Sequence, residues 1–126
     1  RLEGGAYGRV FDVEEAPLAA YAARVRETFC TERLVVYGDR PVKRVASFCG
    51  AGMDEKSVSF ALQAGADTFV SSDPKHHLVA MAVETGMNVL LLTHYAAENY
   101  GFKRFFGRVK EKTDIECAFF EDARLL

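Results

Sequence analysis

His94 and Glu98 are the two side chains in this sequence whose types and spacing are best suited to chemistry. They lie four residues apart, so on a helix or in its first turn both point to the same side. An imidazole and a carboxylate together suit a first-row divalent ion such as zinc, manganese, iron or nickel. The spacing also has a plain structural explanation, because the helix dipole favours an acidic residue in the first turn. Spacing alone leaves both explanations open.

A second group of polar residues runs from Asp73 to His77. Asp73 precedes Pro74 at the expected start of a helix, so its side chain could cap that helix with proline in the first turn. Asp73 could equally take a direct part in a site, and the two roles are compatible. Of the adjacent His76 and His77, we expect one to face a cleft and the other to face water.

The turn Gly50-Ala51-Gly52 follows an apolar run and precedes an expected helix. A strand, a glycine turn and a helix start can together hold a phosphate group. The turn lacks the full spacing of the known nucleotide-binding glycine motifs, so this signal for nucleotide binding is weak. Cys49 stands at the end of the same apolar run. We expect it to be a small buried residue and not a nucleophile, since no neighbour in sequence would lower its pKa.

These residues fall in loops between elements that alternate in a regular way. Three apolar runs are expected to be buried strands, namely residues 45–49, 68–70 and 89–92. Helical periodicity is expected over residues 15–29, from about residue 54 to Gly65, up to Gly86, and after His94 with an apolar stripe of Phe102, Phe106 and Val109. Two further short strands are expected at 34–37 and 115–120, with their pairing left open. The first eight residues are expected to be loop.

Strand, short loop and helix in repetition predict one α/β domain over residues 1–126, a three-layer α/β/α arrangement with a mainly parallel, mixed sheet. In such sheets ligands bind at the carboxyl ends of the strands. The loops at those ends are expected to be 50–52, 71–77 and 93–98. Two of these loops contain or adjoin all three histidines of the chain, together with Asp73 and Glu98.

Composition narrows the class of protein. The net charge is −2 and no stretch carries a run of like charge, which argues against nucleic acid as the main partner. Three widely separated cysteines form no disulfide framework and no zinc-finger pattern, and they fit a reducing compartment. No apolar stretch is long enough for a membrane span and no secretory leader is visible, so we expect a cytoplasmic protein. The chain opens on Arg1, so we expect it to begin inside a longer protein.

Several segments resemble the Nif-three-like family. Residues 43–52 look like the strand and glycine turn that open the C-terminal region of that family, and residues 64–73 resemble its segment of Gly-Ala-Asp followed by Thr-Gly and an acidic residue. Residues 94–98 resemble its signature of histidine, tyrosine, two small residues and glutamate. Residues 8–10 are similar to its Gly-Arg-Ile element. The resemblance covers nearly the whole chain, and it departs from the family where Ser72 and Thr93 replace glycine.

The resemblance implies a fold and a site. Family members are described as dinuclear metal-centre proteins, are named type 2 GTP cyclohydrolase I, and have a duplicated α/β/α structure that forms ring-shaped hexamers. It implies that this chain is the C-terminal half, with His94 and Glu98 as metal ligands and with His77 as the histidine that lines the cleft, the candidate catalytic residue. The remaining ligands, a histidine pair and an acid, would come from the N-terminal half of the same protein.

Two functions follow as hypotheses. In the first, the chain is half of a metal-dependent hydrolase that acts on a nucleotide-like or heterocyclic small molecule, with His77 handling protons and a divalent transition metal as cofactor. In the second, it is a non-catalytic domain that uses the metal as a clamp for assembly or partner binding. Under either hypothesis we expect self-association, and no turnover by this chain alone.

Overall fold

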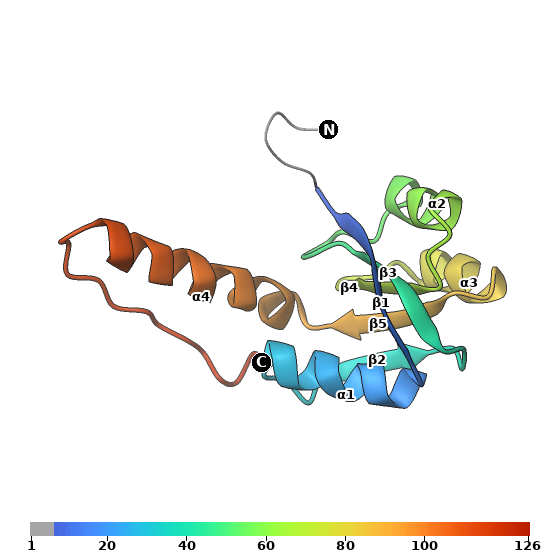
Figure 1. The fold of residues 1–126 in the computed structure, drawn as a ribbon, viewed down its shortest axis with the longest axis horizontal. Coiled ribbons are helices and arrows are strands. Elements are labelled where there is room, and N and C mark those ends of the chain that lie inside the picture. Colours follow the sequence, from blue (N-terminus) through green and yellow to red (C-terminus); the bar gives the residue numbers. More distant parts are fainter. Residues whose placement is uncertain (1–6) are drawn as a thin grey trace.

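The computed structural model describes residues 7–126, which fold around one mixed sheet with helices on both faces (Figure 1). Along the described chain the elements are β1 (Arg9–Ala16), α1 (Leu18–Phe29), β2 (Leu34–Tyr37), β3 (Val42–Ser47), α2 (Glu55–Gln63), β4 (Thr68–Ser71), α3 (His76–Glu84), β5 (Asn88–Leu92) and α4 (His94–Lys112). The fold class predicted from the sequence is confirmed.

The sheet has the strand order β1-β3-β4-β5-β2. The central strands β3, β4 and β5 are parallel, and β1 and β2 pair with them in antiparallel fashion at the two edges. The parallel strands β4 and β5 lie where the apolar runs 68–70 and 89–92 were expected to be strands, whereas β3 begins at Val42 and ends at Ser47, earlier than the expected run 45–49. Because they are parallel, their carboxyl ends lie at one edge of the sheet, and the loops into α2, α3 and α4 start there.

Each face of the sheet packs against its own layer of helices. Phe69 and Val89 face α2 and α3, whereas Val70 and Leu90 face α1 and the first turns of α4. Every residue of β4 and β5 is buried. Strands covered on both faces have no need for alternating polar residues, which explains why their sequences read as continuous apolar runs.

Two expectations about the sheet are wrong. Residues 9–16 form the edge strand β1 and α1 begins at Leu18, whereas a helix was expected from residue 15 and no element was assigned to residues 9–14. Residues 115–120 form no strand; they run back beside α4 (Figure 1), where Phe119 packs on Phe106 with ring centroids 5.3 Å apart. The length of α4 takes the chain away from the sheet, so this segment packs on the helix. Six of the eight residues expected as an opening loop lie outside the described part of the chain.

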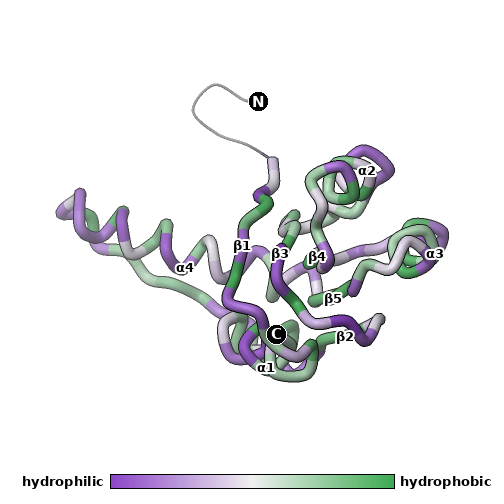
Figure 2. Tube along the Cα trace, turned by 45° about the vertical axis from the view of Figure 1, so that its right-hand side comes forward, coloured by the Kyte–Doolittle hydropathy of each residue, from purple (hydrophilic) through white to green (hydrophobic). Residues whose placement is uncertain are grey.

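The helix α4 contacts the core only through its beginning. Ala96, Ala97 and Asn99 are its buried residues, and beyond them the helix extends away from the sheet, with hydrophobic and hydrophilic residues alternating around it (Figure 2). Phe102 is 61 % exposed and Phe105 is 65 % exposed. Phe102, which belongs to the expected apolar stripe, is therefore not packed against the core. In the described part of the chain, no helix has the length and apolarity that crossing a membrane requires.

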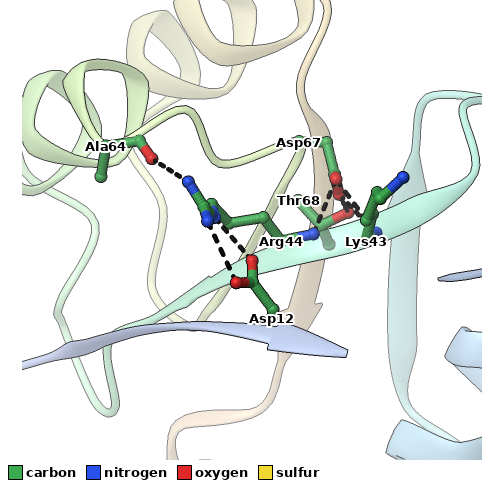
Figure 3. A network of polar contacts seen from close by, with 6 residues as sticks. All are labelled: Asp12, Lys43, Arg44, Ala64, Asp67 and Thr68. Carbon is green, nitrogen blue, oxygen red and sulfur yellow. Dashed lines mark hydrogen bonds and ion pairs between the residues drawn. The ribbon is translucent and has the colours of Figure 1, made fainter. Parts of the chain in front are cut away.

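A polar network fixes the other edge of the sheet, where the parallel strands begin (Figure 3). The carboxylate of Asp67 accepts hydrogen bonds from the backbone N–H groups of Lys43, at 3.0 Å, and Arg44, at 2.7 Å, and from the Thr68 hydroxyl, at 2.7 Å. These bonds hold the start of β3 beside the start of β4. The Arg44 guanidinium lies on the surface of the same network, paired with Asp12.

Asn88 extends this network to the first residue of β5. Its fully buried amide donates to the carbonyl of Arg40 at 3.0 Å and to the Thr68 hydroxyl at 3.1 Å, and its oxygen accepts from the Arg40 N–H at 3.1 Å. Gly38 makes room for it, because a Cβ there would lie 2.3 Å from the Asn88 oxygen. Three parallel strands are thus aligned at their starts, and this alignment also sets where they end.

We expect Asn88→Ala to lower the free energy of unfolding by about 2–3 kcal/mol, because it leaves buried partners without hydrogen bonds. Urea denaturation followed by circular dichroism measures the change. The control is Asp12→Ala, which removes only the exposed ion pair with Arg44 and should leave the midpoint nearly unchanged. Equal midpoints for Asn88→Ala and the unaltered chain would show that the Asn88 network does not stabilise the fold.

Candidate metal centre

The site begins with the way in which α4 starts. Thr93 is the N-cap of this helix, and its hydroxyl accepts a hydrogen bond from the N–H of Ala96 at 3.1 Å. His94 is therefore the first helical residue, directly after β5, and Glu98 lies one turn further on the same side. This confirms the geometry expected from their spacing. A threonine with a capping hydroxyl suits the position where the resembled family has glycine.

The imidazole of His94 lies between two carboxylates. Its Nε2 is 3.1 Å from Oε1 of Glu98, and its Nδ1 is in hydrogen-bond contact with Oδ2 of Asp73. All three side chains are about half exposed, at 45–49 %. The three residues come from the ends of β4 and β5, which are neighbours in the sheet. The structure thus brings Asp73 to the predicted pair.

The expected capping role of Asp73 is wrong. The helix α3 begins at His76, and the preceding residue is Lys75, which makes no side-chain capping bond. Asp73 instead has a left-handed backbone, with φ of 46°, a conformation that aspartate tolerates better than most residues. This turn directs the carboxylate toward His94. The direct role considered beside capping is the one that the geometry favours.

Gly50 packs directly against the side chain of Glu98. Its φ is +60°, and a Cβ on it would lie 2.6 Å from Oε1 of Glu98 and 3.6 Å from Cε1 of His94. A side chain at position 50 would therefore take the space beside the Glu98 carboxylate and the edge of the His94 ring. The glycine turn that weakly suggested a phosphate site lies against the imidazole and the carboxylate.

Two buried serines, which sequence reasoning did not single out, tie the Gly50 loop to the Asp73 loop. The Ser72 hydroxyl donates to the carbonyl of Gly50 at 2.6 Å, and the Ser71 hydroxyl donates to the carbonyl of Phe48 at 2.7 Å. Both serines are at most 1 % exposed. Ser71 is the last residue of β4 and Ser72 follows it, so the only signal in the sequence is a pair of hydroxyl side chains at the end of a buried strand. Ser72 is also where the resembled family has glycine, so here its hydroxyl adds a bond between the two loops.

The charges around His94 favour its protonated form. The hydrogen bond to the Asp73 carboxylate is the main reason why the pKa of His94 is raised above its ordinary value; desolvation opposes this, and the negative charges of Glu98 and Asp73 raise the pKa further. When Nδ1–H donates to Asp73, Nε2 faces a carboxylate oxygen across 3.1 Å. Two lone pairs repel at that distance, so the contact is favourable only when a proton or a cation lies between them.

Three other candidate residues, Cys49, His76 and His77, make no hydrogen bond or ion pair with the His94 ring in the described part of the chain. Cys49 is exposed, so its expected burial is wrong; partial desolvation, and then the charge of Glu98, raise the pKa of its thiol. His76 and His77 are both exposed on the first turn of α3. In the described residues His77 makes no hydrogen bond or ion pair, and the structure does not bring it into contact with His94 or Glu98.

The donor atoms fit one divalent ion as a partial ligand set. Nitrogen and oxygen ligands lie roughly 2.0–2.2 Å from zinc, so two of them on one ion are about 3–4 Å apart. The 3.1 Å between Nε2 and Oε1 falls within that range. Across residues 7–126, no three side chains of the His, Cys, Asp and Glu types are placed to hold an ion together. Within residues 7–126, His94 and Glu98 are thus a candidate pair of ligands, and Asp73 faces the other nitrogen of the imidazole.

Apolar surface adjoins this pair on both sides. One hollow, of about 400 Å³, lies between α4 and the C-terminal segment and is lined by His94, Tyr95, Glu98, Asn99, Phe102, Phe119 and Phe120. A second hollow, of about 770 Å³, lies between α1 and α4 and is lined by Phe29, Ser47, Cys49, Ala97, Glu98, Tyr100, Gly101, Phe102 and Phe105. Glu98 and Phe102 belong to both, so they form the ridge that separates the hollows.

Comparison with known proteins decides the family. The family model described as Duf34/NIF3 (NGG1p interacting factor 3) matches residues 3–124. The chain belongs to the Duf34/NIF3 family. Among relatives, the protein named GTP cyclohydrolase 1 type 2 homolog of Archaeoglobus fulgidus is 29 % identical over 103 residues, which cover 82 % of this chain and 41 % of that protein. The chain thus spans well under half the length of this NIF3 relative.

Solved structures confirm the fold. The structure titled protein ybgI, unknown function, superposes with a TM-score of 0.83 at 19 % identity, covering 95 % of this chain and 49 % of that chain. Reduced HcgD from Methanocaldococcus jannaschii superposes with a TM-score of 0.75 at 24 % identity, covering 87 % of this chain and 44 % of that one. At these identities the likeness extends to the fold alone.

We expect the His94 ring to titrate with a midpoint above the reference value of about 6.5, because both carboxylates favour the imidazolium. Asp73→Asn should lower the midpoint more than Glu98→Gln does, since the Asp73 hydrogen bond is the larger cause. NMR of the ring protons against pH measures this. A raised folded-state pKa stabilises the fold most below about 6.5, and that contribution is lost as the pH rises through the raised value. A midpoint at or below 6.5 in the metal-free chain would contradict the described contacts.

Proposed function

We propose that this chain is a metal-binding part of a metal-dependent hydrolase, in which His94 and Glu98 hold a divalent transition metal at the carboxyl edge of the sheet. The 3.1 Å approach of Nε2 and Oε1, with Gly50 leaving the facing space open, is the observation that carries the proposal. Half-exposed ligands at the end of a central parallel strand are also where α/β proteins bind their ligands.

The other ligands would come from outside these 126 residues. A catalytic metal commonly has three protein ligands and one position for water, and this chain supplies two. The chain spans 41 % of its Archaeoglobus fulgidus relative, which leaves room in such proteins for a second part. We propose that the chain corresponds to the C-terminal half, that an N-terminal half completes the site, and that the chain alone has no turnover.

The chemistry follows from the residue types. A divalent ion at this place would polarise a substrate oxygen and lower the pKa of a water molecule toward neutrality. His94 and Glu98 would bind and orient, and the apolar hollows on both sides of Glu98 would exclude water from a substrate. The relatives' name, GTP cyclohydrolase 1 type 2 homolog, suggests a nucleotide-like or heterocyclic substrate. His77 stays a candidate for proton transfer, and it would need a substrate or a second chain segment to connect it with the site.

The alternative is a non-catalytic domain that is clamped to a partner through the same metal. The observation in its favour is the exposure of Phe102 and Phe105 directly beside Glu98, which suits a contact surface better than an open active site. Turnover separates the two functions. Zinc or manganese together with a nucleotide panel that includes GTP should give turnover only when the protein includes the proposed second half. If that complete protein binds metal and turns over nothing, the clamp is favoured.

We expect His94→Ala and Glu98→Gln each to lower zinc affinity by about tenfold or more, the scale seen even for outer partners of metal ligands. Gly50→Ala should do the same without removing a ligand atom, because its Cβ would displace the Glu98 carboxylate. Isothermal titration calorimetry with zinc measures the affinity. Affinity should also fall as the pH is lowered through the raised pKa of His94, since the proton and the ion compete for Nε2.

Gly101→Ala is the matched control, because a Cβ at that glycine of α4 meets nothing within 4 Å. It should bind zinc like the unaltered chain. Equal zinc affinities for the unaltered chain, His94→Ala and Glu98→Gln would rule out these two residues as ligands.

We also propose that the chain self-associates through the exposed phenylalanines of α4. Burying such rings releases apolar surface from water, which favours association. Sedimentation velocity from micromolar to millimolar concentration should show a mass above that of the monomer. Replacing Phe102 and Phe105 by serine should shift the distribution toward the monomer, whereas Val35→Thr, at another exposed apolar residue, should not. A monomer at every concentration would contradict this proposal.

A further inference from the structure

Asp73 caps no helix, and its side chain instead contacts the imidazole of His94. It lies in the loop after β4, has a positive φ, and directs its carboxylate at Nδ1 of His94, the nitrogen that faces away from Glu98. The two neighbours before it, Ser71 and Ser72, are buried and hydrogen-bonded to the backbone of the loop after β3. The carboxylate is therefore held from a fixed loop.

We propose that Asp73 is a positioning residue for His94, holding its ring with the proton on Nδ1 and the lone pair of Nε2 toward Glu98. Which nitrogen of a neutral imidazole carries the proton is set by the hydrogen bond that the other nitrogen makes. Both carboxylates accept and neither can donate, so Asp73 and Glu98 compete for the one N–H of the neutral ring. The contact with Asp73 is a hydrogen bond, whereas Glu98 approaches Nε2 only at an ion-pair distance, so the geometry favours Nδ1–H. Nε2 is then left as the acceptor nitrogen, on the side where Oε1 and the space beside Gly50 lie.

The geometry also distinguishes a positioning role for Asp73 from a role as a metal ligand. Asp73 and Glu98 contact opposite nitrogens of one ring, so the imidazole lies between the two carboxylates. No third ligand group is assembled among the described residues. Carboxylates in contact with the outer nitrogen of a metal-bound histidine fix the ring orientation and raise its basicity, and their loss commonly costs 10–100-fold in metal affinity. That consequence rests on the proposed function, whereas the effect on the ring does not.

Two variants test the role without straining the backbone. Asp73→Gly removes the carboxylate and suits the positive φ, since glycine adopts it freely. Asp73→Asn keeps the size of the side chain and replaces the carboxylate by an amide that can also donate to Nδ1. Asp39→Asn is the control, since Asp39 is an exposed aspartate of a turn remote in sequence from the site. A dispersed amide NMR spectrum for each variant shows that the fold is retained.

The measurement is the tautomer of the His94 ring, from long-range proton–nitrogen correlations in the metal-free chain at one pH above the ring's pKa. We expect Nδ1–H in the unaltered chain and in Asp39→Asn, and a shift toward Nε2–H in Asp73→Gly, with a smaller shift in Asp73→Asn. The same tautomer in the unaltered chain and in Asp73→Gly would overturn the inference, whatever the metal does.

Zinc titration of the same samples separates this inference from the proposed function. Asp73→Gly should lose about 10–100-fold in zinc affinity, as expected for a residue that acts through the ligand. If the tautomer changes and neither this chain nor the longer protein that carries it binds zinc, the positioning role stands and the metal proposal fails. An unchanged tautomer with a loss of zinc as large as that of Glu98→Gln would overturn the positioning role, because Asp73 would then be a ligand itself.

Discussion

The parallel pairing of β3, β4 and β5 is the constraint on which the candidate site depends. Their starts are aligned by Asp67 and Asn88, and their ends therefore lie side by side at the opposite edge. Each end supplies one part: Gly50 after β3, Asp73 after β4 and His94 after β5. Without that alignment the three residues would be only distant positions in the sequence, since 44 positions separate Gly50 from His94.

The contact between Nε2 of His94 and Oε1 of Glu98 is unfavourable unless a proton or a cation lies between the two atoms. A carboxylate on each side of one imidazole attracts a proton in the metal-free chain, which is why the pKa of His94 is raised. The same arrangement suits a metal ion at Nε2, because the ion can replace the proton there. The hollows beside Glu98 and the exposed rings of Phe102 and Phe105 place apolar surface next to this edge of the sheet. Both features fit a site that is completed by another part of a longer protein or by another chain.

Local sequence patterns were sufficient to predict the helices and strands whose conformation the tertiary contacts also favour. The apolar runs of β4 and β5, the glycines after α2 and α3, and the same-side placement of His94 and Glu98 follow from short-range patterns, and the structure confirms them. The edge strand β1 was missed because most of its residues are exposed, so its pattern lacks the apolar alternation of a buried strand. The segment 115–120 has strand-like composition, but α4 carries it beyond the reach of the sheet. The inward turn of Asp73 could not be predicted, since Asp-Pro before a helix is the usual pattern of a cap and only the contact with His94 distinguishes the two roles.

The central claim is that Nε2 of His94 and Oε1 of Glu98 bind one divalent ion together. Anomalous diffraction at the zinc edge, from zinc-soaked crystals of the protein that carries this chain, tests it most directly. We expect an anomalous peak in contact with both atoms, beside Gly50, with Asp73 on the other nitrogen of the ring. Crystals with zinc bound elsewhere, and with no peak between His94 and Glu98, would contradict it.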